Sequence, residues 1–231
     1  MADTELLARR LQCIREELQS ASGGRYPAPK LIAVTKTHPA EEILPLHGLG
    51  ISEIGENRVQ EIMEKRAGLE RKFQIHLIGR LQSNKVKYII EAVCLIHSLD
   101  RLSLAAEIDR QAHRAGRIMP VLVQGSPAGE EQKGGMPPEE VIPFLEKVRE
   151  MDGLSVRGLM AVMPLSQDEA YLNRLFADMR RLFARVRDTA LDGISMEELS
   201  MGMSGDYKLA AKNGATMVRI GSALLGQRNY R

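Results

Sequence analysis

Eight short apolar runs recur along this chain, and most are separated by a polar segment with the features of a helix. Alternating strands and helices predict a parallel sheet. Eight such units within about 200 residues fit a closed (β/α)8 barrel, also called a TIM barrel. An open, doubly wound sheet is the alternative that the spacing leaves. The predicted strands lie near 31–35, 50–54, 75–79, 93–97, 120–124, 156–162, 198–203 and 216–220, and the predicted helices at 40–47, 57–68, 82–91, 102–115, 138–150, 168–188 and 206–213.

One further helix precedes the first strand. Apolar residues recur at helical spacing over residues 5–19, among them Leu7, Leu11, Ile14 and Leu18. This helix is extra to the eight units, and we expect it to cover one end of the barrel or to pack outside it. Because no linker interrupts the chain, residues 1–231 are predicted to form a single domain.

Composition excludes several classes of protein. The net charge of +2 gives no argument for a nucleic-acid surface, and no apolar run reaches the roughly 18 residues of a membrane span. Cys13 and Cys94 lie far apart and are expected to be reduced. No spacing of Cys, His and Asp resembles a metal site. We therefore expect a soluble cytoplasmic protein without a metal, and a monomer as the default.

Two strand ends late in the chain have the composition of phosphate-binding turns. Ser204 and Gly205 follow the seventh predicted strand, and Gly221 and Ser222 follow the eighth. Small residues at the start of a helix leave backbone N–H groups open to an anion, and the turns after strands seven and eight form a phosphate site in many such barrels. The alternative is that these glycines serve only as tight turns. Asp206 is an acid at this position, and we expect it to point away.

Lys36 closes the first predicted strand. A lysine partly removed from water favours its neutral amine, which is the form that attacks a carbonyl to give a Schiff base. Taken alone, Lys36 is more simply a surface residue just past the end of the strand. Together with the two phosphate-type turns, it suggests that a phosphate-bearing aldehyde is held at both ends.

Arg219 lies inside the eighth predicted strand, where a charge should be rare and should have a partner. Strand alternation places Arg219 on one face with Met217, and we expect that face to line the barrel interior. There the guanidinium can bond a heteroaromatic nitrogen or an acid. The alternative is a buried salt bridge to Glu53 or Glu56, which this reading places at the end of the second strand.

Three other polar residues are less decisive. Asn57 either donates to a ligand oxygen or caps the helix predicted at 57–68. His76 and His97 are more simply core histidines with satisfied hydrogen bonds than ligands. Arg180, Arg181, Arg185 and Arg187 are read as the solvated face of a helix.

These residues, in this order, resemble the pyridoxal 5′-phosphate (PLP) homeostasis protein family, the single-domain relatives of the alanine racemase barrel. The resemblance runs from about Leu6 to Tyr230. It rests on Ala33-Val-Thr-Lys36, Gly55-Glu-Asn-Arg-Val-Gln60, His76-Leu-Ile-Gly-Arg-Leu-Gln-Ser-Asn-Lys85, Ile96-His-Ser-Leu-Asp100, Arg157-Gly-Leu-Met160, Leu199-Ser-Met-Gly-Met-Ser-Gly-Asp206 and Val218-Arg-Ile-Gly221.

The resemblance implies a role for each site residue. Lys36 is expected to carry PLP as a Schiff base, Arg219 to face the pyridine nitrogen and Asn57 to lie near the ring. The phosphate is expected on the two turns formed by Ser204, Gly205, Gly221 and Ser222.

Two departures from the family pattern stand out. The fifth strand exits through Gln124-Gly-Ser-Pro127, and Pro127 lacks a backbone donor, so this strand should end early. Ile75 precedes His76 where the family favours an aromatic residue. The loop at 125–138 is rich in glycine and proline, and we read it as a mobile flap near the barrel mouth.

Three functions are compatible with this sequence. A protein that holds PLP, buffers it and passes it to apo-enzymes is favoured over a PLP-dependent racemase, because no tyrosine lies at a predicted strand exit to act as the second acid/base. Tyr207 is the only near candidate. A phosphosugar enzyme without a cofactor is third, and it requires Glu53 or Glu56 as the base.

Overall fold

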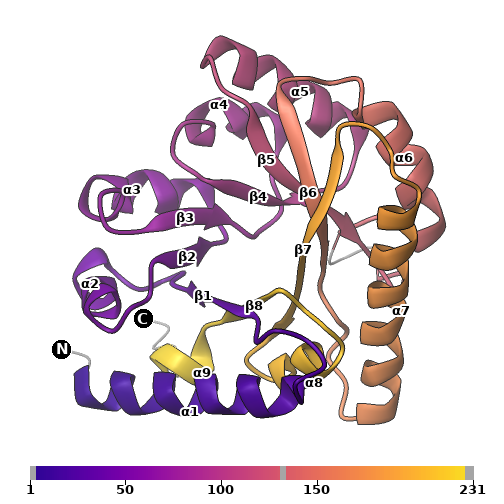
Figure 1. The fold of residues 1–231 in the computed structure, drawn as a ribbon. Helices are drawn as coiled ribbons and strands as arrows, with labels where there is room; N and C mark the ends of the chain where they lie inside the picture. The colour runs from indigo at the N-terminus through magenta and orange to yellow at the C-terminus, as the bar shows by residue number, and fades with distance from the viewer. Residues whose placement is uncertain (1–3, 131–133, 227–231) are drawn as a thin grey trace.

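A closed barrel of eight parallel strands forms the centre of the protein in the computed structural model, which describes residues 4–130 and 134–226 (Figure 1). The strands pair in chain order, and β8 closes the barrel against β1. The predicted (β/α)8 barrel is therefore confirmed, and the open sheet is wrong. The strands are β1 (Lys30–Val34), β2 (Glu53–Glu56), β3 (Gln74–Leu77), β4 (Leu95–Leu99), β5 (Met119–Gly125), β6 (Leu154–Ala161), β7 (Ile194–Met203) and β8 (Met217–Ile220).

Helices follow the strands and surround the barrel (Figure 1). Two of them begin with a single 3-10 turn, and the predicted 82–91 segment is reduced to such a turn and one short helix. The helices are α1 (Thr4–Ser22), α2 (Ala40–Gly48), α3 (Val59–Leu69), η1 (Ser83–Lys85), α4 (Val86–Ile89), α5 (Leu102–Arg114), η3 (Pro138–Glu140), α6 (Val141–Val148), α7 (Glu169–Asp188), α8 (Tyr207–Lys212) and α9 (Ser222–Leu225).

The extra helix α1 packs outside the barrel, against α8 and α9 (Figure 1). Its apolar stripe is Leu7, Leu11, Ile14 and Leu18, all at most 3 % exposed. Burial of four such side chains is worth several kcal/mol relative to leaving them in water. Helix α1 therefore covers the two helices that follow the predicted phosphate turns.

Apolar side chains form two separate clusters, one on each side of the barrel wall. The smaller cluster joins strands across the interior, and its buried members are Ile32, Leu95, Leu122, Met160 and Met217. The larger cluster includes the helices and takes the alternate strand residues, such as Val218 and Ile220. Met217 is therefore inside the barrel, and Arg219 shares its face, as strand alternation predicts.

The second strand begins three residues later than the sequence suggested. Residues 50–52 belong instead to the turn that follows α2, because the N–H groups of Gly50 and Ile51 bond the carbonyls of His47 and Leu46, and Gly50 has a φ of +79°. Glu53 consequently begins β2 rather than ending it, and lies at the end of the barrel opposite the mouth. Its carboxylate is 3.9 Å from the Lys30 ammonium, at the start of β1.

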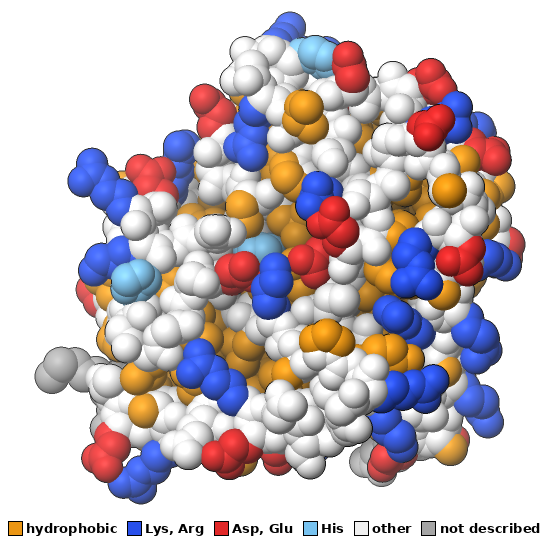
Figure 2. Space-filling model, in the orientation of Figure 1, with side chains coloured by type: hydrophobic (Ala, Val, Ile, Leu, Met, Phe, Trp, Pro, Cys, Tyr) orange, Lys and Arg blue, Asp and Glu red, His pale blue; other side chains and the backbone are white. Residues whose placement is uncertain are grey.

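The surface carries charges of both signs. Figure 2 shows basic side chains along the edge that α7 forms in Figure 1. Arg181, Arg185 and Arg187 are exposed, as expected for a solvated helix face, whereas Arg180 lies over the rings of Tyr26 and Phe183. Among the described helices, none is long and apolar enough to cross a membrane.

Candidate functional site

The predicted site residues all lie at or beside the carboxyl ends of strands, on one rim of the barrel. Lys36 follows β1 and Asn57 follows β2, and both are half-buried. Arg219 is within β8, one residue from its end. The two turns follow β7 and β8 and contribute Ser204, Gly205, Gly221 and Ser222. Because all the strands are parallel, these ends share the barrel mouth, where barrel enzymes place their functional groups.

The turns after β7 and β8 contact each other through one hydroxyl group. Ser204 Oγ accepts hydrogen bonds from the backbone N–H groups of Gly221 and Ala223, each at 3.2 Å. Gly205 is exposed, and a Cβ added to it would meet nothing within 4 Å. Asp206 is turned toward its own loop, because its carboxylate accepts the N–H of Met203 at 2.5 Å. The turns thus bring a hydroxyl and small-residue backbone together, as an anion cradle requires.

Lys36 lies next to this pair of turns by strand pairing. Ile32 of β1 is the register partner of Arg219 in β8. Further toward the mouth, a Cβ on Gly221 would lie 3.3 Å from both the Cβ and the carbonyl oxygen of Val34. Ile32 faces the interior, so alternation gives Val34 the same face, and Lys36 follows two residues after the end of β1. Lys36 and the cradle therefore follow the carboxyl ends of adjoining strands, on the same rim.

A buried ionic network holds the segment that carries Lys36. Lys65 Nζ donates to the Thr35 carbonyl at 3.0 Å and to the carboxylates of Glu56 and Glu61 at 2.9 and 3.1 Å. Thr35 Oγ1 donates to Glu56 at 2.6 Å, and the N–H of Thr37 donates to Glu61 at 2.7 Å. Thr37 has a φ of +69°, a rare value for threonine. The backbone on both sides of Lys36 is thus fixed by α3.

Sequence reasoning missed the roles of Thr35, Glu61 and Lys65. The available signal was Glu56, since a carboxylate at the end of an apolar strand needs a partner. Burial raises the pKa of Glu56, while its bonds to Thr35 and Lys65 oppose that shift. Glu61 and Lys65 have the i, i+4 spacing of a helix ion pair, which points to the partner.

Arg219 does not pair with Glu53 or Glu56, so that alternative is wrong. Its Nη1 donates to the carbonyl and the Oγ of Ser200, at 2.8 and 2.6 Å, and its Nη2 donates to the carbonyl of Ala161 at 2.8 Å. The side chain is only 3 % exposed, and this burial lowers the pKa of Arg219 to about 10. Glu56 is instead directed outward to α3, and Glu53 is at the far end of the barrel.

Asn57 does not cap a helix, because α3 begins at Val59 and Arg58 is its N-cap residue. The backbone of Asn57 is pressed against Gly79, at the end of the β3 segment. A Cβ on Gly79 would lie 2.3 Å from the Asn57 carbonyl oxygen. Gly79 is held in turn by Ser98, whose hydroxyl donates to the Gly79 carbonyl at 2.7 Å. Asn57 can therefore occupy this position only because residue 79 is a glycine and has no side chain.

Gly79→Ala should displace Asn57 and lower stability. The added methyl group overlaps backbone, which cannot move aside cheaply, so we expect a loss of about 2 kcal/mol and a fall of roughly 4–8 °C in Tm. Gly48→Ala is the matched control, because a Cβ there meets nothing within 4 Å. Thermal unfolding followed by circular dichroism checks both variants. Equal Tm values for the two would contradict the close approach of Gly79 to Asn57.

His76 and His97 are core histidines, as expected. They are 2 % and 0 % exposed, and His76 Nδ1 lies 2.9 Å from His97 Nε2. Burial lowers the pKa of His76 to about 4 and that of His97 well below its ordinary value of 6.5. Both imidazoles are thus neutral in the folded protein near neutral pH.

These two histidines should make stability depend on pH. The unfolded chain protonates them near pH 6.5, whereas the folded protein does not until about pH 4 for His76. Below pH 6.5 the unfolded state binds more protons, so stability falls as the pH is lowered from about 6.5 toward 4. The slope approaches about 1.4 kcal/mol per pH unit for each histidine. Urea unfolding at pH 7, 6 and 5 measures it, and a His76→Gln/His97→Gln variant should give a flatter curve.

Two cavities flank the mouth. One of about 520 Å³ is lined by Asn57, Glu61, Arg80 and Lys85, among others. The other, about 280 Å³, lies beside the phosphate-type turns and is lined by Met163, Met203, Gly205 and Asp206, among others. The rim is therefore hollowed at two places, beside Asn57 and beside Gly205.

The loop at 125–138 returns to the end of β5. Met136 N–H bonds the Gln124 carbonyl at 2.9 Å, and Ser126 N–H bonds the Met136 carbonyl at 2.8 Å. β5 ends at Gly125, before Pro127, which agrees with the expected early end. Part of the predicted flap, residues 131–133, lies outside the described residues.

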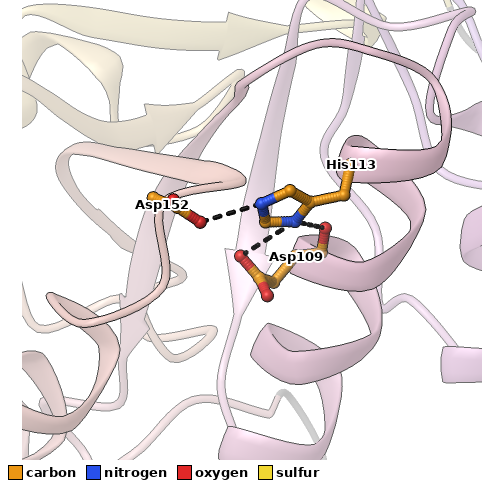
Figure 3. Close-up of side chains that lie close together, drawn as sticks. All are labelled: Asp109, His113 and Asp152. Atoms are coloured by element: carbon orange, nitrogen blue, oxygen red, sulfur yellow. Dashed lines mark hydrogen bonds and ion pairs between the residues drawn. The ribbon is translucent and has the colours of Figure 1, made fainter.

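Asp109, His113 and Asp152 lie close together away from the mouth (Figure 3). His113 Nε2 is 2.8 Å from Asp152, and its Nδ1 lies 2.9 Å from the Asp109 carbonyl oxygen. The bond to this carbonyl, together with the two carboxylates, raises the pKa of His113. Mutual ion pairing at the surface accounts for the arrangement.

The sequence and fold are similar to those of known proteins. The family described as alanine racemase, N-terminal domain, matches residues 4–229. The chain is 39 % identical over 227 residues to the pyridoxal phosphate homeostasis protein of Aquifex aeolicus, covering 98 % of both chains. It is 38 % identical to the protein of that name from Pseudomonas aeruginosa, covering 98 % of this chain and 96 % of that one.

Solved structures also share the fold of this chain. PipY of Synechococcus elongatus, solved with PLP bound, is 36 % identical, with a TM-score of 0.84 over 95 % of this chain and 100 % of that chain. Alanine racemase from Bartonella henselae is 13 % identical, with a TM-score of 0.73, and this chain covers 62 % of it. The likeness to the racemase is one of fold alone.

Proposed function

Because the chain belongs to the alanine racemase N-terminal domain family, and within it to the pyridoxal phosphate homeostasis proteins, we propose that it binds PLP at the barrel mouth. Lys36 attaches the cofactor aldehyde and the turns after β7 and β8 hold its phosphate. The observation that supports this proposal most directly is the juxtaposition on one rim of Lys36 with the cradle formed by Ser204 and Gly221.

The donor set at the mouth fits the group. Ser204 and Ser222 offer hydroxyl groups, and Gly205 and Gly221 offer backbone that no side chain of their own covers. A phosphate oxygen can replace or share the contact that Ser204 Oγ makes with the N–H groups of Gly221 and Ala223. Asn57 lies at the mouth after β2, beside the cavity of about 520 Å³, where it can donate to the ring substituents.

Arg219 is assigned to the pyridine nitrogen. When bound, PLP supplies an aldehyde that reacts with an amine and a ring that can withdraw electrons. A buried guanidinium beside the ring nitrogen disfavours a second positive charge, so that nitrogen stays unprotonated. An unprotonated ring is a weaker electron sink. Arg219 therefore favours retention of the cofactor over chemistry at a bound amino acid.

The surroundings of Tyr207 argue against a racemase. A second acid/base must reach the substrate from the mouth, yet Tyr207 is buried under α1 and its hydroxyl donates to Glu17. Burial, together with the bond to Glu17, raises the pKa of Tyr207. The phosphosugar alternative also loses support, because Glu53 is at the opposite end of the barrel and Glu56 is engaged by Lys65.

We therefore propose that this protein is a cytoplasmic monomer that holds PLP and passes it to PLP-requiring apo-enzymes. A carrier needs a reversible bond and an open mouth rather than a second catalytic group. The chain covers 98 % of the Aquifex aeolicus relative, so it has the extent of proteins that bear the homeostasis name.

Borohydride reduction after incubation with PLP tests the proposal. Reduction should fix one pyridoxyl group on the protein, and peptide mass mapping should locate it on Lys36. Labelling on other lysines alone would contradict the proposed site. Racemisation of alanine or serine above the level of Lys36→Ala would instead favour the enzyme.

A further inference from the structure

A line of polar side chains crosses the interior of the barrel from the mouth to the opposite end. Arg219 Nη1 bonds Ser200 Oγ at 2.6 Å, and Ser200 Oγ lies 3.0 Å from His97 Nδ1. His97 Nε2 lies 2.9 Å from His76 Nδ1, and His76 Nε2 lies 3.8 Å from Glu53 Oε2. The four residues from Arg219 to His76 are each at most 3 % exposed.

The two ends of this line fix the direction of every hydrogen bond in it. Arg219 has only donors, so Ser200 Oγ accepts from it, and the Ser200 proton is available for His97 Nδ1, the direction that the far end of the line favours. His97 must then carry its proton on Nε2 and donate to His76 Nδ1. His76 in turn carries its proton on Nε2, which faces the Glu53 carboxylate.

The opposite direction is unfavourable at the far end. It would place a lone pair of His76 Nε2 against the carboxylate of Glu53. Among the described residues, His76 Nε2 and Glu53 Oε2 are both buried atoms without a hydrogen-bond partner. These two atoms are 3.8 Å apart, and they form a donor–acceptor pair only if His76 carries its proton on Nε2.

This line also limits what Arg219 can offer at the mouth. The bonds to Ser200 and Ala161 use both hydrogens of Nη1 and one hydrogen of Nη2. The Nε–H and the second Nη2–H remain for a ligand. Rotation of the Ser200 hydroxyl away from His97 would release Nη1 and let the guanidinium turn.

We propose that His97, supported by His76, is a positioning residue for Arg219, acting through the Ser200 hydroxyl. This inference rests on the proposed function, in which Arg219 faces the bound PLP. His97 itself touches the neighbouring polar side chains and no part of the ligand. Its role is to accept the hydrogen bond of the Ser200 hydroxyl, which keeps the Ser200 oxygen turned to Arg219 Nη1. The guanidinium then directs its Nε–H and its second Nη2–H to the ligand in one fixed orientation.

The first test uses the protein without PLP and is independent of the cofactor. Nitrogen-15 NMR distinguishes the two neutral tautomers of histidine and the charged form. We expect the neutral Nε2–H tautomer for both His76 and His97 at pH 7. An Nδ1–H tautomer or a charged ring at His97 would contradict the proposed direction of the hydrogen bonds from Arg219 to Glu53, whether or not the protein binds PLP.

The second test compares substitutions at His97. His97→Leu removes the acceptor for Ser200, and we expect the Kd for PLP to rise about tenfold. Asn places its Oδ1 where His97 has Nδ1, so His97→Asn should restore the Kd to within about threefold. Leu122→Ala, in the apolar cluster of the same interior, should lower Tm while leaving the Kd unchanged.

The outcomes separate this inference from the function on which it rests. If Arg219→Ala weakens PLP binding but His97→Leu does not, the positioning role is overturned and the binding site stands. If Arg219→Ala leaves the Kd unchanged, the ligand-facing role of Arg219 fails, and the inference fails with it. Weaker PLP binding in His97→Leu, with affinity recovered in His97→Asn, supports the positioning role of His97.

Discussion

Lys36→Ala is expected to abolish the visible absorbance of the PLP-loaded protein and to raise the Kd for PLP by on the order of 100-fold, or about 2.7 kcal/mol. Removal of the amine removes the covalent bond and leaves the phosphate contacts of the two turns. Weak, reversible binding should therefore persist, and borohydride should no longer fix a pyridoxyl group. Absorbance spectra and equilibrium dialysis at equal protein concentration measure both effects.

Lys30→Gln is the matched control for this prediction. Lys30 begins β1 and Lys36 follows it, so Lys30 is at the opposite end of the barrel, with its ammonium 3.1 Å from the Glu198 carboxylate. We expect its substitution to leave the spectrum and the Kd unchanged. A yellow Lys36→Ala protein, or loss of colour in Lys30→Gln, would mean that the aldehyde bonds a different amine.

The barrel was predictable because its signal is repeated eight times. Each apolar run and each following helix is weak evidence alone, yet the alternation admits few topologies. The placement of Lys36, Ser204 and Gly221 on one rim follows from that topology, since strand ends of a parallel barrel share one face. The error at Glu53 shows the limit, because Ile51 is an apolar residue of the turn after α2 and resembles the start of a strand.

The contacts that support the site were not predictable in the same way. Lys65 reaches Thr35 and Glu56 from a helix, across 30 and 9 residues of sequence. The line from Arg219 to Glu53 draws on five strands, and only the closed barrel brings His97 of β4 beside Ser200 of β7. Periodicity reports which face a residue occupies, and carries no information on which side chains meet across the interior.

Lys65→Met should be the most destabilising of the substitutions considered. Glu56 is 1 % exposed, and Lys65 is its charged partner at 2.9 Å. Removal of one member of a buried pair costs about 3–5 kcal/mol, because the other charge is left uncompensated. For a chain of this size the Tm should fall by roughly 10 °C. Because Lys65 also bonds the Thr35 carbonyl, the variant should bind PLP more weakly as well.

The matched control lies one residue along the same helix. Arg66 pairs with Glu70 at the surface, with side chains 35 % and 43 % exposed, and an exposed pair contributes at most about 1 kcal/mol. Arg66→Met should therefore change the Tm by only a few degrees. The double substitution Lys65→Met/Glu56→Gln should recover most of the lost stability, since it removes the orphaned charge.

The pH dependence of Lys65→Met identifies the cause of its instability. Without Lys65, the pKa of Glu56, which burial already raises, should rise further. The folded state then binds more protons than the unfolded state above the ordinary glutamate pKa of about 4.3, so stability falls as the pH rises. The deficit relative to wild type should shrink between pH 7 and pH 5. A deficit independent of pH would assign the loss to packing of the lysine stem rather than to the stranded carboxylate.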